Sequence, residues 1–189
     1  MKQFASKEIA AFLRAVDKHL DQPFRLDIIG GAAASLAFRI KSGTMDIDAA
    51  NSVVKIEKAS AAARTDTGLD IPLGTASIFD GPYEYESRMN RLRMAGPRQL
   101  QIFVPEKHDW VLMKIVRLIE KDIEDIKEVS ARVRLSKSVL LKRFLEEMTH
   151  VTGRRSELVM NFLTMMEELY GKNEADRMDK AIKGHKHWK

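Results

Sequence analysis

The feature that most constrains the fold of this chain is a pair of glycines between an apolar run and a run of small residues. Residues 24–29 are apolar and alternate, which predicts a short strand, and Gly30 and Gly31 follow directly. Residues 32–40 then predict a helix. Such a turn leaves backbone N–H groups unobstructed at the positive end of a helix, so it can hold a phosphate. A plain tight turn is the alternative.

Two aspartates follow on the next predicted strand, residues 44–49. Because successive side chains of a strand alternate, we expect Asp46 and Asp48 to share one face while Ile47 points into the core. Two carboxylates this close repel each other unless a cation lies between them. Mg²⁺ prefers one or two carboxylates together with substrate phosphates. An Asp-x-Asp on a solvated edge is the alternative, but a glycine turn followed by an aspartate pair favours a phosphate and metal site.

The remaining pattern predicts an α+β (α/β) fold, with a small mixed sheet flanked by helices and a C-terminal helical segment. Outside the residues above, we expect helices over 5–20 and 52–64, a loop over 66–81, and strands over 83–89 and 100–104. From Lys107 the pattern is helical throughout, with one apolar stripe over 111–126 and helices over 136–148 and 154–170. We place a boundary between a nucleotide-site domain, residues 1–131, and a helical segment, residues 132–189. We expect the basic tail, residues 180–189, to be disordered.

Composition narrows the function classes. The 189 residues include no cysteine, so disulfides, thiolate metal sites and cysteine nucleophiles are excluded. The polar N-terminus and the lack of a long apolar run predict no signal peptide and no membrane span, hence a cytoplasmic protein. A net charge of +5 favours anionic partners such as nucleotides or RNA, although a basic surface without such a partner is equally compatible with it.

With its Gly30-Gly31-x-Ala33 turn and its Thr44-x-Asp46-Ile47-Asp48 strand, the sequence resembles the nucleotidyltransferase superfamily with the polymerase-β-like core. More narrowly, it resembles uncharacterised bacterial nucleotidyltransferases and those related to the AbiEii toxin. The second half of the resemblance is a helix that carries Lys114, followed by an Arg and a Lys-Asp-x-x-Asp segment over 121–125. The resemblance covers residues 5–130 and implies a nucleotidyltransferase-like core.

The resemblance implies Mg²⁺-dependent transfer of a nucleotidyl group from an NTP such as ATP to an acceptor, which is an RNA (including tRNA) or a protein. A toxin of a toxin–antitoxin system is one implied role, and a cognate antitoxin is then a partner. Each site residue takes an implied role by its position in the motifs. The nucleotide-binding residues are Gly30, Gly31, Lys114 and Asp125, of which the glycines hold the triphosphate and Lys114 contacts phosphate. The metal ligands are Asp46, Asp48 and Glu86. The catalytic set is Asp46, Asp48, Glu86 and Asp122, and Asp122 or Asp125 orients the acceptor or acts as base.

The chain departs from the superfamily pattern in three respects. Alanine follows the glycines where the superfamily usually has serine, and the spacing from turn to aspartates is long. No third carboxylate is obvious. Glu84 and Glu86 share a face of the predicted strand 83–89, and we prefer Glu86. Without a third ligand, the alternative is a catalytically inactive module that binds nucleotide, RNA or a partner protein.

Asp122 and Asp125 share a helix face, so they also fit simple pairing with Lys121 or Arg117. The arginines at 88, 91 and 93 fit either a triphosphate or RNA contact or a solvated hairpin.

Overall fold

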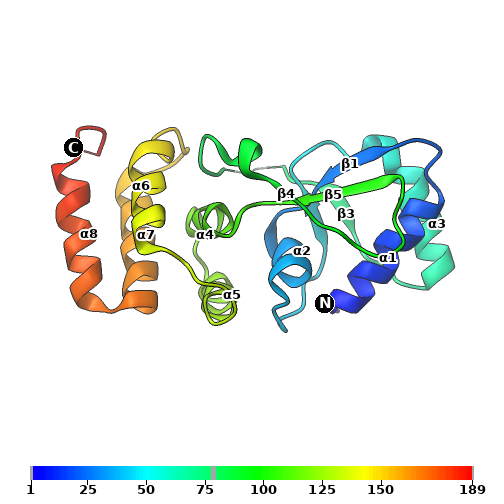
Figure 1. Cartoon of the computed structure of the whole chain (residues 1–189), viewed down its shortest axis with the longest axis horizontal. Helices are drawn as coiled ribbons and strands as arrows, with labels where there is room; N and C mark the ends of the chain where they lie inside the picture. The colour runs from blue at the N-terminus through cyan, green and yellow to red at the C-terminus, as the bar shows by residue number, and fades with distance from the viewer. Residues whose placement is uncertain (1, 78–79, 189) are drawn as a thin grey trace. The chain divides into compact units, whose positions relative to one another are not determined.

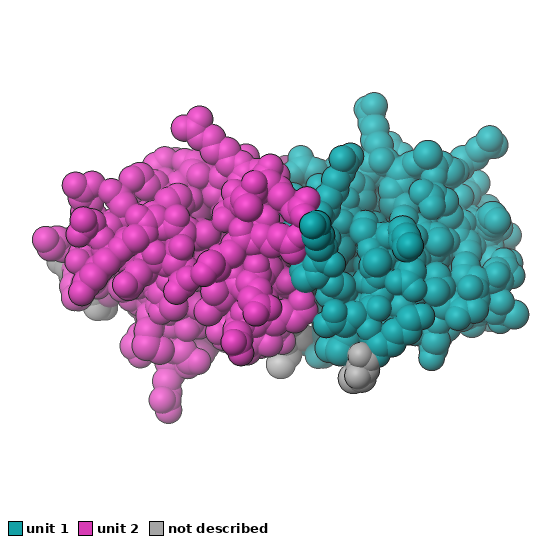
Figure 2. All heavy atoms as spheres, turned by 90° about the horizontal axis from the view of Figure 1, so that it is seen from below, with its two compact units in different colours: residues 1–78, 89–105 teal, residues 79–88, 106–189 magenta. Residues whose placement is uncertain are grey.

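The structure is a computed structural model of the chain, and it describes residues 2–77 and 80–188. The chain forms two compact units (Figure 2). Unit 1 comprises residues 1–78 and 89–105, and unit 2 comprises residues 79–88 and 106–189. The boundary predicted after residue 131 lies inside unit 2. Within the described ranges, no helix is both long enough and apolar enough to cross a membrane.

A three-stranded mixed sheet forms the centre of unit 1 (Figure 1). In it, β1 (Phe24–Asp27) pairs in parallel with β5 (Leu100–Val104), and β4 (Asn90–Arg91) pairs antiparallel with the other edge of β5. A second sheet joins β2 (Ile47–Ala49) in parallel with β3 (Leu73–Thr75). The predicted α+β fold with a small mixed sheet is therefore confirmed, but β3 lies where a loop was predicted.

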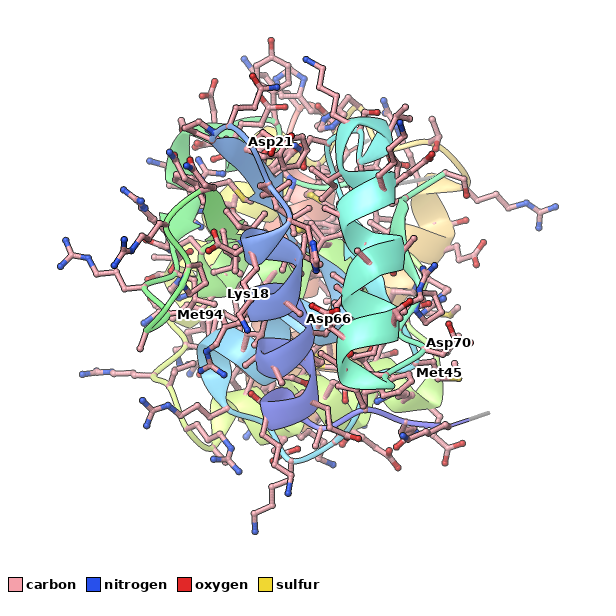
Figure 3. All side chains as sticks on the ribbon, turned by 90° about the vertical axis from the view of Figure 1, so that its right-hand side faces the viewer. Lys18, Asp21, Met45, Asp66, Asp70 and Met94 are labelled. Atoms are coloured by element: carbon pink, nitrogen blue, oxygen red, sulfur yellow. The ribbon has the colours of Figure 1, made fainter. Side chains whose placement is uncertain are left out.

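Two helices pack side by side in unit 1, as Figure 3 shows. They are α1 (Ser6–Lys18) and α3 (Glu57–Thr67), the second preceded by the 3₁₀ turn η2 (Val54–Ile56). The fully buried apolar residues of α1 recur at helical spacing, as predicted: Ile9, Phe12, Leu13 and Val16. The helix α1 begins at Ser6, and the side chain of Glu8 caps it by accepting a hydrogen bond from the N–H of Ala5 at 2.8 Å.

The helix after β1 begins at Gly30 itself. It runs as α2 (Gly30–Ala33) and continues as the π-helix η1 (Ala34–Phe38), which ends at Arg39 in the left-handed conformation with φ 56°. The glycines are therefore the first residues of the helix and do not form a separate turn before a helix at Ala32. Its buried face consists of small side chains, which allows close packing: Ala32, Ala33, Ala34 and Ser35.

Unit 2 is helical. Its helices are α4 (Lys107–Ile115), α5 (Glu120–Ser130), α6 (Lys137–Glu147), α7 (Arg155–Tyr170) and α8 (Lys172–Gly184). The predicted apolar stripe over 111–126 is interrupted, because Leu118 adopts φ 43° and Asp122 caps α5 by accepting the N–H of Ile119 at 3.2 Å. The stripe thus belongs to two helices.

Two further predictions for unit 2 are wrong. The expected strand 83–89 is the 3₁₀ helix η3 (Tyr85–Arg88), in which Ser87 donates both its N–H and its hydroxyl to the carbonyl of Glu84 at 3.2 and 2.8 Å. The tail is ordered as far as Trp188, since α8 occupies much of it. The Trp188 ring stacks on Phe144 with centroids 4.4 Å apart and donates its indole N–H to the carbonyl of Leu145 at 3.0 Å.

Candidate functional site

An antiparallel bridge joins Ile28, the residue after β1, to Ala49, the last residue of β2. Two hydrogen bonds flank this bridge. The N–H of Ile29 donates to the carbonyl of Asp48 at 2.9 Å, and the N–H of Ala50 donates to the carbonyl of Asp27 at 2.8 Å. Gly30, the next residue after Ile29, is therefore held directly beside Asp48.

The backbone of both glycines lies close to the aspartate strand. Gly30 adopts φ +62°, and a Cβ there would lie 3.4 Å from Oδ2 of Asp48. A Cβ at Gly31 would lie 2.8 Å from Oγ1 of Thr44, closer than real side chains come. Gly31 is therefore required by close packing on Thr44, while Gly30 supplies a left-handed backbone conformation that other residues rarely adopt.

The aspartates alternate in burial as predicted, although β2 begins only at Ile47, so Asp46 precedes the strand. Ile47 and Ala49 are fully buried, whereas Asp46 and Asp48 are partly exposed. The hydroxyl of Thr44 donates to the carbonyl of Asp46 at 3.2 Å and lies 3.4 Å from its Oδ1. This buried threonine fixes the approach to β2, and the sequence reasoning named it in a motif without giving it a role.

Carboxylates are the ligands that Mg²⁺ prefers, together with substrate phosphates. Asp46 and Asp48 are therefore the side chains of unit 1 that could hold such a cation. Across the described residues, no group of three or more His, Cys, Asp or Glu side chains is gathered closely enough to hold a metal. Asp27, the last residue of β1, is paired with Arg25, whose Nε donates to its Oδ1 at 2.7 Å.

Lys114, Asp122 and Asp125 come together in unit 2. Nζ of Lys114 lies 2.6 Å from Oδ1 of Asp122 and 3.5 Å from Oδ2 of Asp125, and both aspartates are 1% exposed. Lys121 pairs with Asp125 at 3.0 Å, and Arg117 pairs with Asp122 at 3.3 Å. Asp122 thus contacts two cations and caps α5 through the N–H of Ile119, and this geometry suits it to hold the Lys114 ammonium in position.

Glu86 lies in η3 of unit 2 rather than on a strand, so the shared strand face that singled it out does not exist. Its side chain is exposed, and its Oε1 accepts a hydrogen bond from the hydroxyl of Tyr85 at 3.3 Å. Its role as third metal ligand stays a prediction.

Arg88, two residues further on, is part of a buried network of ion pairs. It donates from Nε and Nη2 to both oxygens of Asp109, at 2.7 and 3.0 Å, and from Nη2 to Glu147 at 2.6 Å. Burial alone would lower the pKa of the Arg88 guanidinium, but the hydrogen bonds to Asp109 and Glu147 outweigh it and raise the pKa. Arg88 is therefore held by ion pairs within unit 2 and does not form a basic surface with Arg91 and Arg93.

The same network orders the start of α4. The N–H of Ser136 donates to Nε2 of His108 at 2.8 Å, so Nδ1 carries the proton and donates to Oε1 of Glu106 at 2.9 Å. Glu106 also accepts from Arg143. Burial alone would raise the pKa of Glu106, but the hydrogen bonds from His108 and Arg143 lower it to about 2.

The structure therefore groups the predicted site residues into two clusters. In unit 1, Gly30 lies beside Asp48, while Gly31 and Asp46 both lie beside Thr44, and unit 2 brings together Lys114, Asp122 and Asp125. The sequence reasoning missed the buried Asp109. A carboxylate at the third position of a helix whose stripe is otherwise apolar is the signal that could have found it.

A family model described as "Nucleotidyltransferase of unknown function (DUF6036)" matches residues 6–173. The chain belongs to this family, so the predicted membership of the nucleotidyltransferase superfamily is confirmed, while the narrower resemblance to AbiEii is not. No curated protein and no solved structure shows significant similarity to the chain.

Proposed function

We propose that the protein is an Mg²⁺-dependent nucleotidyltransferase that transfers a nucleotidyl group from an NTP to a hydroxyl of an RNA or protein acceptor. The observation that carries the proposal is the contact between the glycine backbone and the aspartate strand, with a Gly30 Cβ position 3.4 Å from the Asp48 carboxylate. Membership of a nucleotidyltransferase family supports it.

In the proposed reaction, the acceptor oxygen forms a bond to the α-phosphorus as the bond from that phosphorus to pyrophosphate breaks, and the acceptor proton leaves to a base or to solvent. The N–H groups at the start of α2 would bind the triphosphate, because the positive end of a helix attracts phosphate. Asp46 and Asp48 would hold Mg²⁺, which when bound neutralises phosphate charge and orients the α-phosphorus.

For unit 2 we propose the roles implied by the family resemblance, with Lys114 as a phosphate contact and Asp125 supporting it. Pairing with Asp122 supports a positioning role for that aspartate, because the ion pair fixes the Lys114 ammonium. Glu86 remains the proposed third ligand. A toxin role with a cognate antitoxin is a further proposal, supported only by the resemblance.

The alternative is a nucleotide-binding module without catalysis. The observation that favours it is that the described residues gather no set of three metal-binding side chains.

The test is nucleotide transfer by the full chain, with Mg²⁺, each α-labelled NTP in turn, and total RNA or cell protein as acceptor. Asp46→Asn/Asp48→Asn removes two carboxylates at the site. The matched control, Asp21→Asn/Asp70→Asn, removes two exposed carboxylates elsewhere in unit 1, both labelled in Figure 3.

We expect label in the acceptor with wild type and control, and a loss of at least about 100-fold in the site variant. If the wild-type protein binds NTP without transferring it, the hypothesis of a non-catalytic binding module replaces that of an enzyme. If the wild-type protein neither transfers nucleotide nor binds NTP, the proposed site is refuted.

A further inference from the structure

The segment from the end of η3 to the end of β5 carries positively charged side chains only. Residues 87–105 include four arginines and no carboxylate. Arg88 is paired inside unit 2, but Arg91, Arg93 and Arg98 of unit 1 are exposed. Among the residues that the structure describes, none forms an ion pair or hydrogen bond with these three guanidinium groups. Three cations therefore face solvent from one short stretch of unit 1.

Two of these arginines line a groove of about 360 Å³. Arg91 and Arg93 belong to its walls, and the other lining residues are apolar: Leu92, Met94, Pro97, Leu100 and Ile102. A groove of this size admits one or two nucleotides but no A-form helix. It therefore combines guanidinium groups for phosphates with apolar surface for a sugar or base.

The loop between β4 and β5, which carries Arg93 and Arg98, is fixed to α1. One oxygen of Asp17 accepts three successive backbone N–H groups, those of residues 98, 99 and 100, at 2.9, 2.7 and 2.7 Å. Nε of Arg14 donates to the carbonyl of Ala95 at 2.9 Å, and Figure 3 shows Met94 beside α1. The arginines are thus presented from an anchored backbone, which lowers the entropic cost of binding an extended polyanion.

The groove also has a defined position relative to the candidate site of unit 1. Arg91 pairs with Phe103 of β5, and Phe103 pairs with Asp27 of β1, so the three lie in one row across the sheet. Two strand spacings separate Arg91 from Asp27 by about 10 Å. The row that begins at Arg91 therefore ends at Asp27, three residues before Gly30 along the chain.

Guanidinium groups bind phosphate oxygens through paired, charge-assisted hydrogen bonds. The regularly spaced phosphates of a nucleic acid strand can bind three cations that lie on β4 and the loop after it. RNA also has the hydroxyl group to which a nucleotide is transferred. We propose that Arg91, Arg93 and Arg98 bind the backbone of single-stranded RNA, and that RNA is the acceptor. This inference rests on the proposed function for the acceptor role.

The test is binding of a labelled single-stranded 15-nucleotide RNA of mixed sequence to the full chain, followed by fluorescence anisotropy over a range of salt. The variant is Arg91→Gln/Arg93→Gln/Arg98→Gln. The matched control, Lys7→Gln/Lys55→Gln/Lys58→Gln, removes three exposed cations elsewhere in unit 1. A poly-glutamate peptide of equal charge serves as a second probe.

For the arginine variant, we expect affinity to fall about tenfold at 0.1 M salt, and the slope of log K against log salt to become less steep by about 2, since each single-strand phosphate contact contributes about 0.7. The lysine control keeps the affinity and slope of wild type. The peptide binds wild type far more weakly than the RNA does.

Three outcomes would overturn the proposal. They are an unchanged RNA affinity in the arginine variant, an equal loss in the lysine control, and equal binding of RNA and peptide, which would indicate an acidic protein partner. Because the measurement needs neither NTP nor Mg²⁺, it is independent of the transfer assay. Asp21→Asn/Asp70→Asn, which lies outside both proposed sites, is expected to bind RNA as wild type does. RNA binding without nucleotide transfer would refute only the enzyme, so failure of either proposal is seen separately.

Discussion

At the scale of single residues, Gly31 has no room for a side chain. The nearest atom to an added Cβ is Oγ1 of the buried Thr44 at 2.8 Å, whereas a Cβ at Gly74 of β3 meets nothing within 4 Å. We expect Gly31→Ala to lower the free energy of unfolding by about 1–3 kcal/mol, because overpacking forces the backbone or Thr44 to move. Gly74→Ala, the control in the same unit, should be neutral or slightly stabilising.

Urea denaturation followed by circular dichroism measures both Gly31→Ala and Gly74→Ala. Thr44→Ala in the Gly31→Ala background should recover part of the loss, since it removes the closest atom. Equal midpoints for wild type and Gly31→Ala would show that the glycine is not required for packing.

Lys114 is the second residue whose environment makes a prediction. Its side chain is 12% exposed and faces two carboxylates that are 1% exposed, while Arg117, which pairs with the same Asp122, is 68% exposed. Removing one partner of a buried pair leaves an uncompensated charge. We expect Lys114→Met to cost about 3 kcal/mol of unfolding free energy, and Arg117→Gln to cost under about 1 kcal/mol.

A double-mutant cycle of Lys114→Met with Asp122→Asn, measured by urea denaturation, checks the origin of this cost. The double variant should lose less than the sum of the single variants, because Asn at 122 no longer needs a cation yet still caps α5. Strict additivity would mean that the ion pair is not the cause.

At the scale of elements, the start of α4 links stability to pH through Glu106. Hydrogen bonds from His108 and Arg143 hold its pKa at about 2, below the ordinary 4.5. A carboxylate with a depressed pKa stabilises the fold above its unfolded pKa and loses that contribution as pH falls. We expect up to about 3 kcal/mol of stability from this group to disappear between pH 4.5 and pH 2.

The pH dependence of unfolding in wild type and Glu106→Gln measures this contribution. The variant should be less stable at pH 6 and should show a shallower decline below pH 4.5. Glu84→Gln, which removes an exposed glutamate of the same unit, should follow the wild-type profile. A decline as steep in Glu106→Gln as in wild type would assign the acid sensitivity to other groups.

At the scale of the whole molecule, the C-terminal helix completes the core of unit 2 beyond the end of the family match at residue 173. The rings of Trp188 and Phe162 both stack on the ring of Phe144, with centroid distances of 4.4 and 4.1 Å. We expect Trp188→Ala to cost about 2 kcal/mol of unfolding free energy through lost stacking and burial.

Trp188→Phe is the control, because it keeps an aromatic ring and loses only the indole hydrogen bond to Leu145. Its cost should stay below about 1 kcal/mol. Chemical denaturation of both variants distinguishes packing from the hydrogen bond. Wild-type stability in Trp188→Ala would show that the end of the chain contributes little to unit 2.

Local patterns in the sequence determined a large part of this protein. The strand before Gly30, the helical second half and the apolar faces of α1 and α7 follow from periodicity, since each reflects burial of one face of a regular element. The glycine pair and Asp46-Ile47-Asp48 could be assigned to one site because they follow each other in the order strand, glycine pair, helix and aspartate strand. Their chemical roles remain predictions.

Only the tertiary structure decided the features that depend on partners distant in the chain. The strand β3 forms because β2 offers an edge, although the sequence over 73–75 resembles a loop. Residues 83–89 alternate like a strand but form η3, whose Arg88 is held by Asp109 and Glu147, 21 and 59 residues away. Periodicity reports which face of an element is buried; it carries no information on which distant side chain will neutralise a buried charge or pair with an open strand edge.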